Sequence, residues 1–123
     1  HATADKDTVL SWAPEEMFAF VLYYRQNTTP YERWRVGEWT RQLVDAALAS
    51  GGRYYLPYQV HATREQFLKG YPRFPEYAAL KKRLDPQNRF RNALWDAYAA
   101  PTPDRILREV ADAHPKYYRP EEQ

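Results

Sequence analysis

Residues 51–72, GGRYYLPYQVHATREQFLKGYP, decide how the chain is built, because one element ends there and the next begins. The two glycines favour the left-handed turn that closes a helix. Thr63 and Gln66 have the spacing of a capping box, which predicts a new helix running to Gly70. The run RYYLPYQV between these signals is predicted to be extended, although Pro57 limits its pairing within a sheet.

A long helix is predicted before the glycines, over residues 31–50. Thr29 can act as its N-cap and Pro30 can occupy its first position, where these residue types favour helix initiation. Apolar side chains recur along it at three- and four-residue steps, the pattern of one helical face. They are Val36, Trp39, Leu43 and Ala47.

Shorter helices are predicted after this stretch. One starts at Pro75 and must end before Pro86, since proline disfavours helical backbone in the residue before it. The turn sequence DPQN follows, and RFRNALWDAYA can form one or two helical turns. A last helix is expected from Thr102, so that residues 93–113 are C-terminal helices and residues 114–123 a tail.

The fold class depends on MFAFVLYY, at residues 17–24. This run is apolar on both alternating faces, which is typical of a central strand covered on both sides, and we expect the strand to reach residue 27. With the extended run at 53–60, this predicts an α+β fold with several packed helices and an incomplete antiparallel sheet of two or three strands. Such a sheet is a poor stand-alone structure. Residues 1–123 are therefore expected to be a single domain or a fragment of a larger protein, with strand and helix units over 14–92.

Composition narrows the classes of function. The chain has 18 basic and 16 acidic side chains, a balance that does not predict a nucleic-acid binder, and no apolar run approaches the roughly 20 residues of a membrane span. The absence of cysteine fits a cytoplasmic location. His1, His61 and His114 are too far apart in sequence to suggest a metal site, and no glycine-rich phosphate loop opens a helix.

Two surface features are candidates for function. Tyr54, Tyr55, Tyr58, Gln59 and His61 gather on one short irregular run, where they form either a binding surface or a packed, hydrogen-bonded wall. The basic stretch KKRLDPQNRFRN, residues 81–92, is either a phosphate-binding patch or a solvated surface. The second interpretation is favoured there, because aromatic residues are few.

A set of motifs indicates a family. Gly51-Gly52-Arg53 leads to a Tyr-Leu pair, the next helix ends in Tyr-Pro, and LDP is followed by Phe90 and Asn92. Over about forty residues, this order resembles the C-terminal end of FAD-linked oxidases and dehydrogenases of the vanillyl-alcohol-oxidase type. The aldonolactone and alditol oxidases and decaprenyl-phosphoribose oxidase are the most similar members.

The resemblance implies an FAD-dependent oxidoreductase that transfers hydride from an alcohol, lactone or similar hydroxylated substrate to flavin. This chain would supply the C-terminal cap segment, with Tyr58 and Gln59 beside the reaction and with Tyr55, Tyr58 and Asn92 near the cofactor. Related enzymes often carry a lysine at the place of Tyr58, and a phenol supplies a hydrogen bond but no full charge. The FAD-binding domain, absent from these residues, would be the partner, so the chain alone is expected to be inactive.

Two other functions remain open at this stage. The chain could be a small non-catalytic module that binds a protein or nucleic acid through its aromatic and basic surface. It could also be a helper subunit with no site of its own, stabilised by docking. Binding that weakens steeply with salt would favour a nucleic-acid module over a cap segment.

Overall fold

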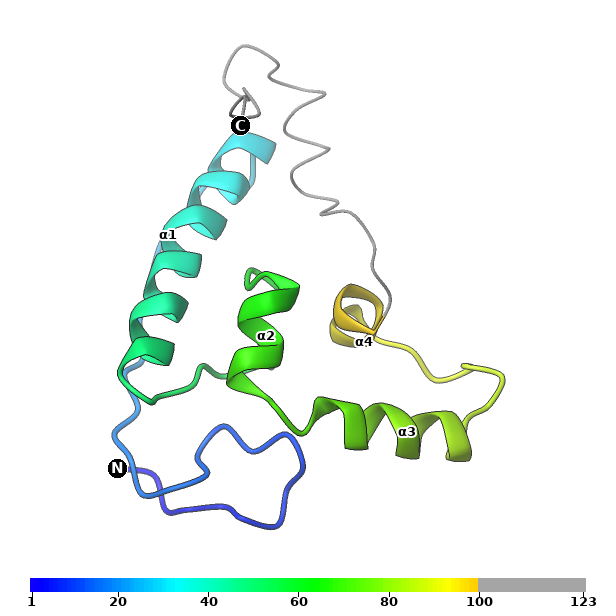
Figure 1. Cartoon of the computed structure of the whole chain (residues 1–123). Helices are drawn as coiled ribbons and strands as arrows, with labels where there is room; N and C mark the ends of the chain where they lie inside the picture. The colour runs from blue at the N-terminus through cyan, green and yellow to red at the C-terminus, as the bar shows by residue number, and fades with distance from the viewer. Residues whose placement is uncertain (100–123) are drawn as a thin grey trace, which may run out of the picture.

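The computed structural model describes residues 1–99, in which four helices are joined by irregular segments. In chain order the helices are α1 (Pro30–Ala49), α2 (Arg64–Gly70), α3 (Phe74–Leu84) and α4 (Ala93–Tyr98). Figure 1 shows α2 between α1 and α4, while α3 leads away beneath them. The helix predicted from Thr102, the tail at 114–123 and His114 lie outside the described residues.

The limits of α1 follow from its terminal residues, as predicted. The Thr29 hydroxyl accepts a hydrogen bond from the Glu32 amide at 3.3 Å, and Pro30 is the first helical residue. At the other end Gly51 has a φ of 75°, a left-handed conformation that favours glycine. The predicted apolar face is only partly right. Val36 is buried, but Leu43 is 44% exposed and Val44 is buried in its place.

The capping box of α2 is confirmed and also joins α2 to α1. The Gln66 amide donates to the Thr63 hydroxyl at 3.1 Å, and the Thr63 amide donates to the Gln66 side chain at 2.9 Å. The Gln66 side-chain nitrogen then donates to the carbonyl of Arg41 at 3.0 Å and to the carboxylate of Asp45 at 2.7 Å. One buried glutamine therefore starts a helix and fixes its position on its neighbour.

The predicted helices at α3 and α4 are also present. The last residue of α3 is Leu84, two positions before Pro86. Asp85 then closes the loop, because its carboxylate accepts the backbone amides of Arg89 and Phe90, both at 2.9 Å. Asn92 caps α4 by accepting the Trp95 amide at 2.8 Å.

The core is a group of aromatic rings around α2. Phe67 and Tyr71 are fully buried, and Phe67 stacks on Tyr98 of α4 with ring centroids 4.0 Å apart. Phe74 meets the edge of Phe67 at 4.9 Å, and Val44 contributes from α1. A short chain thus obtains a core from a few large rings, each of which buries a large apolar area.

The α+β prediction is wrong, because residues 1–99 contain no β-strand. Residues 17–27 are irregular, and a single antiparallel bridge joins Ala2 to Met17. The run at 53–60 is not a strand either and includes a turn around Pro57. A strand exists only if a neighbouring backbone pairs with it, and the described part of the chain brings no such backbone alongside either run.

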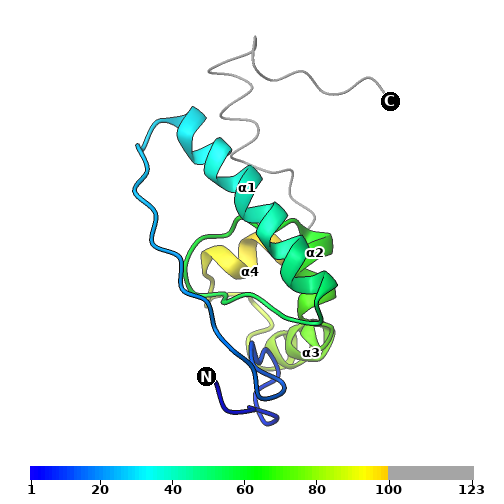
Figure 2. The same ribbon diagram turned by 90° about the vertical axis from the view of Figure 1, so that its left-hand side faces the viewer.

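The N-terminal segment runs beside α1 and loops below the helices (Figure 2). Arg53 holds the loop in place, because its guanidinium donates to the Ser11 carbonyl at 2.6 Å. The same guanidinium lies over the ring of Tyr71, 5.7 Å from its centroid. Within residues 1–99, none of the helices is long and apolar enough to cross a membrane.

Candidate functional site

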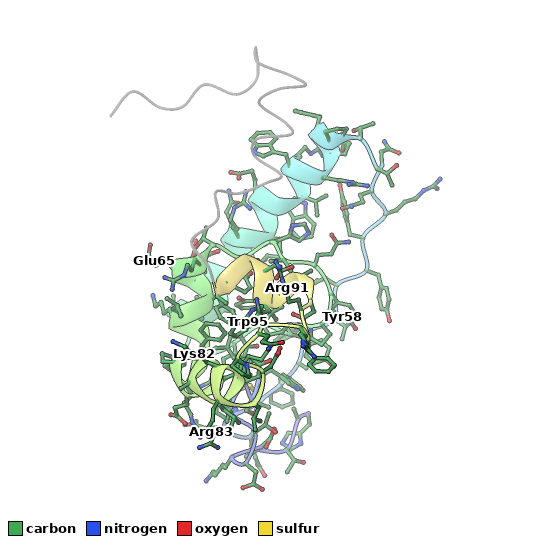
Figure 3. The ribbon with its side chains drawn as sticks, turned by 90° about the vertical axis from the view of Figure 1, so that its right-hand side faces the viewer. Tyr58, Glu65, Lys82, Arg83, Arg91 and Trp95 are labelled. Carbon is green, nitrogen blue, oxygen red and sulfur yellow. The ribbon has the colours of Figure 1, made fainter. Side chains whose placement is uncertain are left out.

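Three aromatic rings form a ladder that runs from the partly buried Trp12 to the exposed Tyr58, and two of them were predicted as site residues. Trp12 meets Tyr55 edge to face with ring centroids 5.6 Å apart, and Tyr55 meets Tyr58 in the same way at 5.4 Å. Tyr58 is 77% exposed and points outward (Figure 3). We call Trp12, Tyr55 and Tyr58 the aromatic ladder. The structure therefore brings the two predicted tyrosines together.

The ladder faces outward because the neighbouring tyrosine faces inward. Tyr54 packs edge to face on Tyr71 with centroids 5.6 Å apart, and its carbonyl accepts a hydrogen bond from the Tyr71 hydroxyl. This bond anchors the backbone of the run just before Tyr55. Successive side chains of extended backbone point to opposite sides, so Tyr55 is directed to solvent.

The inward tyrosines do not have the properties of acid-base groups. Burial raises the pKa of Tyr54 above its ordinary value, as do the neighbouring Tyr98 and Tyr71. Burial likewise raises the pKa of Tyr71, although the Arg53 guanidinium opposes the shift. Both phenols are therefore neutral at physiological pH and serve as packing residues. Of the predicted packed, hydrogen-bonded wall, the packing is confirmed at Tyr54, whose hydrogen bond with Tyr71 is accepted by the backbone carbonyl.

Gln59 and His61 have different surroundings. Gln59 is exposed beside Tyr58, and its carbonyl accepts the His61 amide at 3.0 Å. His61 is partly buried near Gly37 of α1, and its carbonyl accepts a bond from Arg41 at 3.0 Å. Gln59 thus remains with the aromatic ladder, whereas His61 belongs to the contact between this loop and α1.

Asn92 has a structural role that the motif comparison did not include. Its side-chain oxygen is the N-cap of α4, so this atom is already used within the chain. No hydrogen bond or ring contact among residues 1–99 joins Asn92 to the aromatic ladder. The structure thus gives Asn92 a role in starting α4, and its predicted cofactor contact stays a prediction.

Trp12 is the ladder residue that sequence reasoning did not identify. It lies in the irregular N-terminal segment, more than forty positions from Tyr55. The only signal was a large aromatic residue in a polar lead-in, which indicates packing but does not name a partner. The Arg53 bond to Ser11 brings the two segments together.

The aromatic ladder can bind a flat, polar group. It offers ring faces and phenol hydroxyls, and Gln59 adds an amide. These groups fit the ring portion of a flavin. They do not fit its phosphates, because Gly51 and Gly52 follow a helix instead of opening one. In residues 1–99, no group of three or more histidine or acidic side chains can hold a metal ion.

Comparisons with family models, curated proteins and solved structures found no match to this chain. They therefore lend no support to a description of the chain as a flavoprotein with a cap domain, and the α+β part of that description is corrected by the helical fold. The family assignment stays a prediction from the motifs in residues 51–92.

Proposed function

We propose that this chain is the C-terminal cap segment of an FAD-dependent oxidoreductase and acts only when it is docked on an FAD-binding domain. The motifs over residues 51–92 support the family, and the aromatic ladder supports a contact with the cofactor ring or the substrate. When bound, FAD would accept hydride from an alcohol, lactone or similar hydroxylated substrate. Tyr55, Tyr58 and Gln59 would orient the ring and the substrate.

The main support for docking on another domain is the exposure of the apolar run at residues 18–24. Phe20 is 89% exposed and Tyr23 is 96% exposed, and four other large side chains of the run are at least half exposed, although Tyr24 also packs edge to face on Trp39 of α1. They are Phe18, Val21, Leu22 and Tyr24. Contiguous apolar surface of this kind marks a contact with another protein surface.

The backbone of the same run also lacks partners. Residues 18–28 make no backbone hydrogen bond to any other residue that the structure describes. Burying each large apolar side chain contributes about 1.5–3 kcal/mol, and the backbone amides must then find partners on the covering surface. A docked protein domain can satisfy both needs at once.

The first test is cofactor binding by the isolated chain and by the whole gene product. We expect no flavin absorbance in the 123-residue chain and no binding when FAD is titrated in, because the phosphates would be held elsewhere. The whole gene product should purify yellow. Tight FAD binding by the isolated chain, or a colourless whole product, would contradict the proposal.

A pair of variants tests the docking run in the whole gene product. Phe20→Asp with Leu22→Asp should reduce FAD retention, since two carboxylates would have to be buried in an apolar contact. Lys6→Asp with Arg33→Asp is the control, because both side chains are exposed and neither lies in the run. Equal FAD retention in the two double variants would refute docking through residues 18–24.

A further inference from the structure

Residues 5–13 form a closed loop, which we call the N-terminal loop. The Asp5 amide donates to the Ala13 carbonyl at 2.8 Å, so the two ends of the loop meet. Inside it, the Asp5 carboxylate accepts the amide of Thr8 at 3.1 Å, and the Ser11 hydroxyl accepts the amide of Ala13 at 3.2 Å. Because the loop is closed by its own bonds, one further contact can fix its position on the helices.

Arg53 fixes the N-terminal loop on the core through its guanidinium. The guanidinium donates to the Ser11 carbonyl at 2.6 Å and lies over the Tyr71 ring, 5.7 Å from the centroid. Ser11 and Tyr71 are both buried, so Arg53 joins the loop to the core where little solvent reaches. Within residues 1–99, no carboxylate pairs with Arg53. Its charge therefore strengthens a hydrogen bond to a backbone carbonyl.

The carbonyl that Arg53 holds belongs to the peptide bond that leads into Trp12. Arg53 also precedes Tyr55 by two residues, so it lies close in sequence to one partner of the Trp12–Tyr55 contact and is bonded next to the other. These two rings meet with centroids 5.6 Å apart, inside the range of about 4.5–7 Å that favours aromatic pairs. In the part of the chain that the structure describes, the Arg53 bond is the one hydrogen bond between the N-terminal loop and residues 53–60. The contact between Trp12 and Tyr55 therefore depends on Arg53.

Trp12 also brings a hydrogen-bond donor to the aromatic ladder. Its indole N–H makes no hydrogen bond with any residue that the structure describes, and an indole nitrogen can only donate. Beside the Tyr55 and Tyr58 hydroxyls, this donor suits a flat ring that carries carbonyl oxygens at its edge. The isoalloxazine ring of FAD is such a ring.

We infer that Arg53 is the positioning residue of the aromatic ladder: it holds Trp12 against Tyr55, and Trp12 contacts the isoalloxazine ring. This inference rests on the proposed function, because that function supplies the ring. Arg53 acts on the ring only through Trp12. Loss of the guanidinium and loss of the indole should therefore weaken FAD binding equally, and the two effects should not add.

The test titrates FAD into the apo form of the whole gene product and follows flavin fluorescence to obtain a dissociation constant. Arg53→Met keeps an unbranched side chain but removes the charge and the donors. It should raise the dissociation constant by about three- to tenfold, the size expected for one aromatic contact. Trp12→Ala should raise it by the same factor. The double variant should match either single variant within about twofold.

Two further variants separate positioning from general stability. Arg53→Lys keeps a donor for the Ser11 carbonyl, so it should raise the dissociation constant less than Arg53→Met does. Arg64→Met is the matched control, because Arg64 donates to the Tyr98 carbonyl at 3.2 Å and makes no contact with the aromatic ladder in residues 1–99. It should leave the dissociation constant unchanged. If circular dichroism shows that Arg53→Met has lost its helices, Arg53→Lys replaces it in the comparison with Trp12→Ala.

Three results would overturn this inference, and they differ from one another. If the wild-type product binds FAD but Arg53→Met behaves like Arg64→Met, Arg53 has no positioning role while the proposed function stands. If the effects of Arg53→Met and Trp12→Ala add fully in the double variant, Arg53 does not act through Trp12. If the wild-type product binds no FAD, the proposed function fails and the inferred ring contact fails with it.

Discussion

Tyr54 and Tyr55 occupy adjacent positions and have opposite environments. Tyr54 is held in the core by Tyr71, whereas Tyr55 lies between Trp12 and Tyr58 at the surface. Tyr54 contributes its packed ring and a backbone carbonyl that accepts the Tyr71 hydroxyl, while a phenol in the aromatic ladder has a hydroxyl available to a ligand. The functional question at the scale of single residues therefore concerns Tyr55 and Tyr58.

Tyr58→Phe tests this assignment in the whole enzyme. Under the proposed function, Tyr58 donates a hydrogen bond to the reduced flavin, so the variant should lower turnover by about tenfold or more. The thermal midpoint should stay within about 1 °C, since the hydroxyl of an exposed residue makes no contact that supports the fold. Steady-state kinetics and a melting curve on the same sample measure both. Unchanged turnover would show that the hydroxyl has no such role.

At the scale of elements, terminal residues fix where the helices begin and end, and the aromatic core packs them together. α2 has only seven residues, too short to be stable alone, yet it is held by the capping box and by Gln66 bonded to α1. α3 ends in a loop that the Asp85 carboxylate closes. Changes at these few positions should therefore affect whole elements.

Thr63→Ala should lower the free energy of unfolding by about 1 kcal/mol, because the Gln66 amide loses its acceptor at the start of α2. Thr63→Ser retains the hydroxyl and is the matched control. Urea unfolding followed by circular dichroism measures the difference. Equal midpoints for the alanine and serine variants would show that the cap does not stabilise α2.

The pKa of Asp85 predicts how the stability of the loop after α3 changes with pH. The hydrogen bond from Lys81, followed by those from the amides of Arg89 and Phe90, lowers the pKa of Asp85 to about 2. The ordinary value is about 3.9, so the ionised carboxylate stabilises the loop above about pH 4, and this contribution is lost as the pH falls towards 2. Melting curves from pH 6 to pH 2 should show a smaller decline for Asp85→Asn than for the wild type. Parallel declines would contradict this role.

At the scale of the whole molecule, the chain has an aromatic core around α2 and an N-terminal segment with little support. Arg53 bonded to Ser11 and the Ala2–Met17 bridge hold the first part of this segment. Residues 18–28 then run to α1 with exposed apolar side chains and unpaired backbone. The aromatic core around α2 is thus buried within the chain itself, whereas residues 18–28 need a partner to cover them.

Limited proteolysis should detect this difference. Arg25 is exposed within the unpaired run, so trypsin should cut after it before it cuts at the basic residues inside α1 and α2. Docking in the whole gene product should protect the same bond. Mass spectrometry of the early fragments identifies the cleavage site. Early cuts inside α1 or α2, or equal cleavage after Arg25 in both forms, would argue against a covered run.

The sequence alone determined where the helices begin and end, because caps, prolines and glycines act on the backbone within a few residues. Thr29, Thr63 and Gly51 each have the local role that their chemistry predicts. The sequence did not determine whether residues 17–27 form a strand, because a strand requires a partner backbone that a local pattern cannot supply. Only the tertiary structure placed Trp12 against Tyr55, because that contact joins segments far apart in the chain.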